Sequence, residues 1–141
     1  MDLREKIAKA KQEFAEAEPV RVPVEVGGES TLIEFLPVLG SVWVGLTAVN
    51  PARPGADGDD ELGYNPDGVT AAYPVDRVLV DGDVVSAEVW ADLYGVLTAP
   101  ARTVIANDLW REYQLRPALR LAAAGKEWKG GLVSSPDSPE S

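Results

Sequence analysis

The chain has 141 residues, with 13 lysines and arginines, 23 aspartates and glutamates, and neither histidine nor cysteine. This composition excludes disulfides, thiol nucleophiles, imidazole bases, and the zinc and iron–sulfur sites that need such ligands. A net charge of −10 at pH 7 repels phosphate backbones, so we expect no nucleic-acid partner. The sequence has no apolar run near the roughly 18 residues of a membrane span, and its start is charged. We therefore expect an intracellular protein that contacts no membrane.

Residues 1–18 are predicted to form an N-terminal helix. Apolar residues recur there at alternating spacings of four and three, which places them in one stripe along a helix: Leu3, Ile7, Ala10, Phe14 and Ala17. The stripe is narrow and includes two alanines, so it would pack weakly alone. We expect it to lie on another surface, either of its own domain or of a partner.

A β-hairpin is predicted for residues 20–36. Alternate residues of its first half are valines, the period of a half-buried strand: Val20, Val22, Val24 and Val26. Pro23 has no N–H to donate to a neighbouring strand, which places this strand at a sheet edge. Gly27-Gly28 suits a tight turn, after which Ile33 and Phe35 belong to the returning strand.

Residues 38–80 combine short apolar patterns with one long polar segment. Helical spacing predicts a helix over 38–49, whereas 50–68 holds three prolines, four glycines and five acids and is typical of a loop. Residues 69–80 are ambiguous: Val69–Tyr73 allows a short helix that Pro74 interrupts, and Val78–Val80 allows a strand that turns at Asp81-Gly82.

The last part of the chain is predicted to be helical. Ser86 and Thr98 are expected N-caps of two helices, which would form an antiparallel pair. A further helix over 115–124 should stop at Gly125. We thus expect an α+β fold: an N-terminal helix (1–18), an α+β domain (19–125) with an acidic loop (50–68), and a flexible C-terminal tail (126–141). The expected core is Val22, Val24, Ile33, Phe35, Trp43, Leu46, Trp90, Leu93, Ile105 and Leu109.

The residues give no positive sign of catalysis or of cofactor binding. The acidic run Asp57, Asp59, Asp60 and Glu61 does not have the spacing of an EF-hand, and nothing marks an acid/base pair. No glycine cluster precedes the lysine of a phosphate-binding loop. We expect no enzyme, no cofactor and no metal, and we interpret 50–68 as a solvated acidic loop.

Partner contact is the remaining class of function. The N-terminal stripe and the edge strand lie close together in sequence, and a helix face and a sheet edge are both common docking surfaces. The basic segment 114–131 contains Trp128, which lies outside any apolar pattern of a core. This segment is either a partner contact or an ordinary solvated face. The candidate partner-binding residues are Leu3, Ile7, Phe14, Val22, Val24 and Trp128, and they would serve self-association or the binding of another protein.

The order of these features resembles one known family. A charged helix and a valine-rich hairpin precede FLPVLGSVWVGLT at 35–47, then GYNPD at 63–67, VWADL at 89–93 and AND at 106–108. Over most of residues 1–131 this resembles the tail assembly chaperones of long, non-contractile-tailed phages of actinobacteria (siphoviruses).

The resemblance implies a function without catalysis. Such a chaperone coats the phage tape measure protein, keeps it soluble and helps the tail tube protein assemble around it. It acts in the cytoplasm of the infected bacterial host and is not expected in the mature virion. The family also implies a longer frameshifted product, for which Gly125-Lys126 is a candidate position. Two alternatives stay open: a virion structural subunit (tail, connector or decoration protein), and a host-directed regulator or toxin–antitoxin partner.

Overall fold

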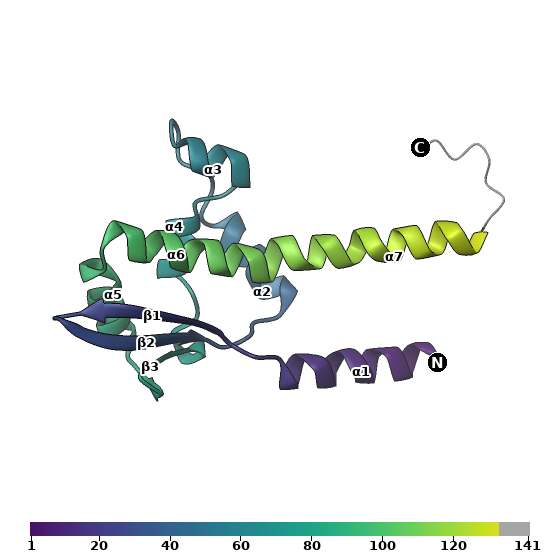
Figure 1. The fold of residues 1–141 in the computed structure, drawn as a ribbon, viewed down its shortest axis with the longest axis horizontal. Coiled ribbons are helices and arrows are strands. Elements are labelled where there is room, and N and C mark those ends of the chain that lie inside the picture. The colour runs from purple at the N-terminus through teal and green to yellow at the C-terminus, as the bar shows by residue number, and fades with distance from the viewer. Residues whose placement is uncertain (133–141) are drawn as a thin grey trace.

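The computed structural model describes the backbone of residues 1–132 and the side chains of residues 1–127. It has the expected α+β class, with an N-terminal helix, an antiparallel hairpin and a mainly helical second half (Figure 1). In chain order the elements are α1 (Leu3–Glu16), β1 (Val20–Val26), β2 (Glu29–Phe35), α2 (Gly40–Ala48), α3 (Asp57–Leu62), α4 (Pro66–Ala71), the 3₁₀ turn η1 (Val75–Arg77), β3 (Val78–Val80), β4 (Asp83–Val84), α5 (Ala87–Val96), α6 (Ala99–Trp110), the π-helical turn η2 (Arg111–Leu115) and α7 (Arg116–Leu132).

The strands form one antiparallel sheet in the order β1-β2-β3-β4. Val22 pairs with Ile33 across the hairpin, and Ile33 pairs with Val80 on its other side. Gly27 and Gly28 have φ angles of 59° and 82°, a region that suits glycine, so the hairpin prediction is confirmed. The strand alternative for Val78–Val80 is also confirmed, with its turn at Asp81-Gly82.

The core lies between one face of this sheet and helices α4, α5 and α6. The rings of Phe35 and Tyr73 meet edge to face with centroids 5.1 Å apart, and Trp90 meets Phe35 at 5.8 Å. Eight of the ten expected core residues are buried, and Leu46 and Leu93 are partly buried against the same cluster. The apolar pattern of the sequence was therefore a good guide to this part of the chain.

A short chain of hydrogen bonds ties the β2–α2 connection to the helical half. The Tyr73 hydroxyl donates to the Leu36 carbonyl at 2.7 Å, and it lies 2.9 Å from the Tyr113 hydroxyl. Because the single proton of Tyr73 goes to Leu36, Tyr113 must be the donor between the two hydroxyls. The Val38 amide in turn donates to Tyr113 at 3.0 Å. These bonds fix the loop that positions α2.

The prediction of a loop at 50–68 was wrong, because this segment contains α3 and the start of α4. Asp59, taken as a solvated acid, is 2% exposed and accepts hydrogen bonds from the Arg53 backbone and guanidinium at 2.8–3.0 Å. Asn65 caps α4 by accepting from the Gly68 amide at 3.0 Å. Side-chain hydrogen bonds, rather than an apolar pattern, thus order this polar segment.

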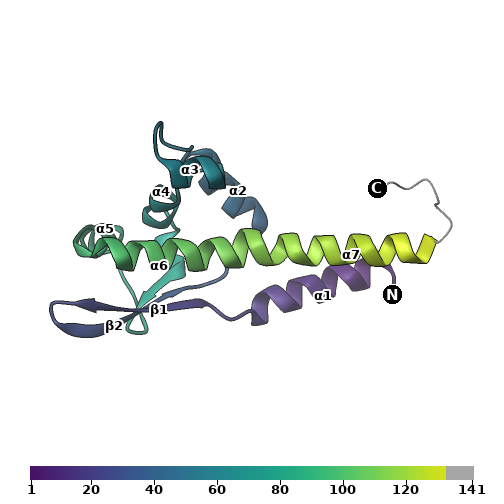
Figure 2. The ribbon, with the colours of Figure 1, turned by 45° about the horizontal axis from the view of Figure 1, so that its top comes forward.

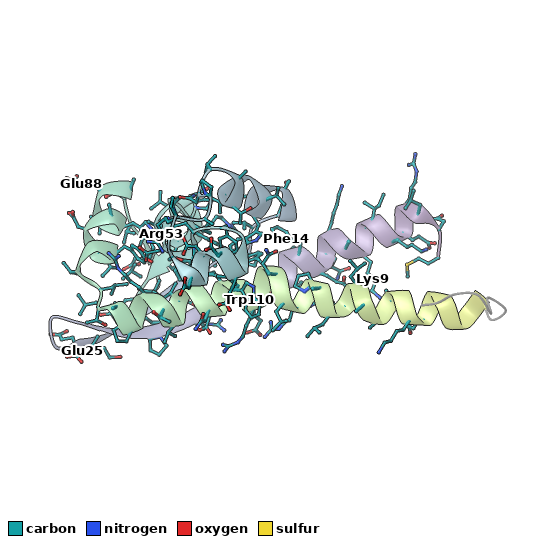
Figure 3. All side chains as sticks on the ribbon, turned by 90° about the horizontal axis from the view of Figure 1, so that it is seen from above. Lys9, Phe14, Glu25, Arg53, Glu88 and Trp110 are labelled. Atoms are coloured by element: carbon teal, nitrogen blue, oxygen red, sulfur yellow. The ribbon has the colours of Figure 1, made fainter. Side chains whose placement is uncertain are left out.

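Two expectations for the last helices were wrong. Ser86 and Thr98 are N-caps as predicted, but α5 runs across the start of α6 instead of antiparallel to it (Figures 2 and 3). Gly125 does not end a helix, since α7 continues to Leu132 and is joined to α6 through η2 without a break. The expected tail at 126–141 is therefore helical up to 132, and residues 133–141 lie outside the described part.

Two helices extend from the same end of the molecule. Both α1 and α7 leave the sheet and the short helices and run outward to one side (Figures 1 and 2). We call α1 and α7 the two arms, and residues 17–115 the body.

Candidate functional site

The first arm, α1, is a well-capped helix whose apolar stripe is mostly exposed. Asp2 and Glu5 form a capping box, in which each side chain accepts from the other residue's backbone N–H at 2.8 Å. None of the described residues of α1 is buried, and Leu3 and Ile7 are 70% and 45% exposed. The helix is thus formed by local interactions, while the outer part of its apolar face finds no cover on the body.

Phe14 is the point where this arm meets the body. Its side chain is half-buried and lines a hollow of about 350 Å³ together with Val38, Val42 and Arg77. Figure 3 shows Phe14 beside α2, with Lys9 farther out along the arm. Of the predicted stripe, the inner end therefore packs on the domain and the outer part is free to contact a partner.

The second arm, α7, differs from the body in charge. Residues 116–132 carry four basic side chains and one acidic one, whereas residues 17–115 carry sixteen acidic and five basic ones. Leu119 and Leu121 on this arm are 61% and 75% exposed. The candidate Trp128 is in the helical backbone of α7, but its side chain lies outside the described residues.

The structure places Val22 and Val24, two of the predicted partner-binding residues, in the core instead. Their side chains are 1% and 8% exposed and belong to the core, because alternate residues of β1 face the helices. Strand β1 can therefore offer a partner only its backbone edge.

Pro23 makes this open edge of β1 a poor docking site for a partner strand. Both backbone groups of Leu32 bond to Asp81, the N–H at 2.9 Å and the carbonyl at 2.8 Å, so they face away from β1. Pro23 is opposite Leu32 in the register and therefore directs its backbone toward the open edge, where it has no N–H to donate. Addition of a partner strand to β1 would lose the donor in the middle of the strand.

Two carboxylates of the body, the buried Asp59 and the partly exposed Asp67, are each paired with an arginine. The Arg53 guanidinium and backbone N–H bond to Asp59 and lower the pKa of that carboxyl below its ordinary value. Arg102 contacts Asp67 at 3.2 Å and lies over the ring of Tyr94, whose hydroxyl donates to Asp67. Burial, followed by the Asp67 bond, raises the pKa of Tyr94, and burial raises the pKa of Tyr64 to about 12. The two carboxylates are each held by an arginine, an arrangement that stabilises the α3–α4 region.

The described residues show neither a metal-binding cluster nor a membrane-spanning helix. No three acidic side chains among them gather closely enough to hold a metal ion. Within the same part of the chain, no helix combines the length and apolar character needed to cross a bilayer.

A hollow of about 540 Å³ lies where the roots of both arms meet the body, and the sequence analysis missed it. Its residues come from the α1–β1 connection and from the α6–η2–α7 helix: Ala17, Glu18, Pro19, Val20, Arg21, Asp108, Arg111, Glu112, Arg116 and Arg120. We call it the arginine hollow. The basic segment 114–131 pointed to Arg116 and Arg120, but nothing local in the sequence joins them to Arg21.

Comparisons of this chain with protein-family models, with curated proteins and with solved structures found no match.

Proposed function

We propose that this protein is a tail assembly chaperone of a long, non-contractile-tailed phage. It would bind the tape measure protein through its two arms, keep that protein soluble and promote assembly of the tail tube protein around it. It would act in the cytoplasm of the infected host, remain outside the mature virion and carry out no catalysis. Two things support this proposal: the sequence resemblance and the exposed apolar side chains of the two arms.

The observation that carries the proposal is the pair of uncovered apolar arms. Leu3 and Ile7 on α1 and Leu119 and Leu121 on α7 are all at least 45% exposed. Leu3 and Ile7 lie one turn apart on the same face of α1, and a soluble protein rarely leaves such a face uncovered unless another chain occupies it, whereas Leu119 and Leu121 point to different sides of α7. An amphipathic helix is the partner that such helix faces fit best, because it buries its own apolar stripe in the same contact.

The charge of the body supports a temporary role. Sixteen acidic against five basic side chains at 17–115 keep the molecule soluble and repel other copies of the body. A tape measure protein covered by this chaperone would stay soluble until tail tube subunits displace the chaperone.

The first test is co-expression with the tape measure protein. We expect the wild-type chain to move the tape measure protein from the pellet to the soluble fraction, and Leu3→Asp with Ile7→Asp to lose this effect. The matched control is Val84→Asp with Val89→Asp, two valines of the body that are 63% and 50% exposed. Equal loss in both double variants would contradict a role for the arm.

The second test separates a chaperone from a virion subunit. Mass spectrometry of purified particles should find no peptides of this chain, whereas a tail, connector or decoration protein would be present in many copies. Abundant peptides in intact particles would replace the proposal by the structural alternative.

A further inference from the structure

The apolar stripe of α1 continues onto α2. Leu3, Ile7 and Phe14 share one face of α1, because they are spaced by four and seven residues. Phe14 lies beside α2 (Figure 3) and lines the hollow of about 350 Å³ with Leu39 and Val42, which are 55% and 38% exposed. Leu3 and Ile7 therefore point to the same side of the molecule as this hollow. We call these five residues the apolar track.

The dimensions of the apolar track fit an amphipathic helix. Leu3 and Phe14 are eleven residues apart, which is about 16 Å along a helix, and the hollow extends the apolar surface beyond Phe14. Ala10 lies between Ile7 and Phe14 in the stripe, and its small side chain lets the axis of a second helix come close. At the inner end of the track, a partner helix has room for an apolar side chain in the hollow.

Basic side chains lie along the outer half of the track. Residues 4–11 carry four basic side chains and one acidic one, Glu5, which belongs to the capping box. Arg4, Lys6 and Lys11 are exposed, and none of them forms an ion pair with a described residue. Successive residues of a helix are about 100° apart, so these three lie within about 90° of the centre of the stripe, whereas Glu5 lies on the opposite side. The outer half of the track is therefore flanked by positive charge that no ion pair among the described residues neutralises.

The inner half of the track has the opposite charge. Glu13 and Glu16 follow the basic residues of α1, and Asp76 lines the hollow. An acidic residue of a partner would be attracted to the outer half and repelled near the acidic body. The charges thus favour one direction of binding, with the acidic part of a partner helix along residues 4–11 and its less acidic end at the hollow.

We propose that the apolar track binds an amphipathic helix whose apolar stripe is flanked by acidic residues. This inference rests on the proposed function, because the helix would be a segment of the tape measure protein. A helix of this kind buries its apolar stripe against the track and pairs its carboxylates with the free basic side chains. A phospholipid surface is the less suitable occupant, since it cannot enter the hollow and, when anionic, would be repelled by the body.

The test measures binding of a dye-labelled amphipathic peptide to the full chain by fluorescence anisotropy. The peptide has leucines at spacings of three and four and glutamates on both sides of this stripe. The reference probe is the same peptide with lysine in place of every glutamate. We expect the wild-type chain to prefer the glutamate peptide by about tenfold or more, and Lys6→Glu with Lys11→Glu to reverse this preference. Higher salt should narrow the preference of the wild-type chain.

Matched controls test the place of binding on each helix. Lys9→Glu makes the same change on the side of α1 away from the stripe, and it should keep the preference within about threefold of wild type. Val42→Asp in the hollow should weaken binding of the glutamate peptide by about tenfold, whereas Val44→Asp, on the other side of α2 and 64% exposed, should change it by less than about twofold. Circular dichroism and thermal melting check that each variant is folded.

Several outcomes would overturn the proposal. A reversed preference in Lys9→Glu would show attraction by overall charge rather than by the track. Tighter binding of the chain to anionic phospholipid vesicles than to the glutamate peptide would make a membrane surface the occupant. In analytical ultracentrifugation, a wild-type oligomer that Lys6→Glu with Lys11→Glu converts to a monomer, with no preference between the peptides, would make a second copy the occupant.

The same experiments separate this inference from the proposed function. A clear preference for the glutamate peptide, with a tape measure protein that stays in the pellet on co-expression, would support the track and reject the chaperone. Equal binding of the two peptides, with a tape measure protein that becomes soluble, would reject the track and keep the chaperone.

Discussion

Ile33 and Ile7 carry the same side chain, yet Ile33 in β2 is 0% exposed and Ile7 on α1 is 45% exposed. The difference separates the core of the body, whose apolar side chains cover one another, from the outer part of α1, where Leu3 and Ile7 are exposed. The body is held by packing between distant segments, whereas α1 is held by its capping box and its own backbone bonds. Stability should therefore depend on the body and association on the arms.

The largest expected effect is the loss of Trp90 from the body. Trp90 is 2% exposed, meets Phe35 and Tyr94, and donates its indole N–H to the Ala71 carbonyl at 3.2 Å. Trp90→Ala should lower the free energy of unfolding by about 3–5 kcal/mol in chemical denaturation. Val89→Ala, at the exposed neighbouring position, should change it by less than about 0.5 kcal/mol. Similar values for both variants would mean that Trp90 does not support the core.

A smaller effect is expected from a single buried hydroxyl. Tyr73→Phe removes the donor to the Leu36 carbonyl and the acceptor for Tyr113, and should cost about 1–3 kcal/mol. Tyr64→Phe is the matched control, since the buried Tyr64 hydroxyl has no hydrogen-bond partner among the described residues. Denaturation curves of the two variants should differ clearly, and a loss in Tyr64→Phe as large as in Tyr73→Phe would contradict this account.

The third prediction concerns acid and the order of the α3 region. The pKa of Asp59 is lowered from 3.8 in the folded chain, so its ion pair with Arg53 stabilises the fold above about pH 4 and is lost as the pH falls toward the folded-state value. The difference in unfolding free energy between wild type and Asp59→Asn should be largest at neutral pH and should narrow below about pH 4. Denaturation between pH 3 and 7 measures it.

The control for this pH dependence is the exposed neighbour Asp60, whose carboxylate makes no ion pair with any described residue. Asp60→Asn should follow the wild-type profile throughout. A difference for Asp59→Asn that stays constant with pH would show that its charge is not what orders the segment.

The smallest expected effect is on the arm. Ile7→Ala should change the free energy of unfolding by less than about 0.5 kcal/mol, because Ile7 is 45% exposed and lies outside the core. Ile33→Ala, the same substitution in the body, should cost about 2–5 kcal/mol. Thermal melts of both variants at several protein concentrations give the comparison, and a concentration-dependent loss in Ile7→Ala would show that the arm is covered by another copy.

Local patterns determined much of this fold. The alternating valines and the glycine pair at 27–28 specified the hairpin, and Ser86 and Thr98 specified two helix starts, because strand period, positive φ and capping depend on neighbouring residues. The apolar stripe of α1 was also predicted from its local spacing. The same stripe could not reveal whether it would be covered, since that depends on where the helix leaves the body.

Tertiary structure decided the features that depend on distant residues. The polar segment at 50–68 is partly helical, with the buried carboxylate of Asp59 held by the half-exposed Arg53, and polar side chains give no periodic signal of such a pairing. Helices α6 and α7 are joined through the wider turn η2, where the sequence predicted a separate helix over 115–124. The arginine hollow required Arg21 to meet Arg116 and Arg120 across the fold. Sequence periodicity fixed which faces are apolar, and only the packed chain decided which of those faces and charges are left for a partner.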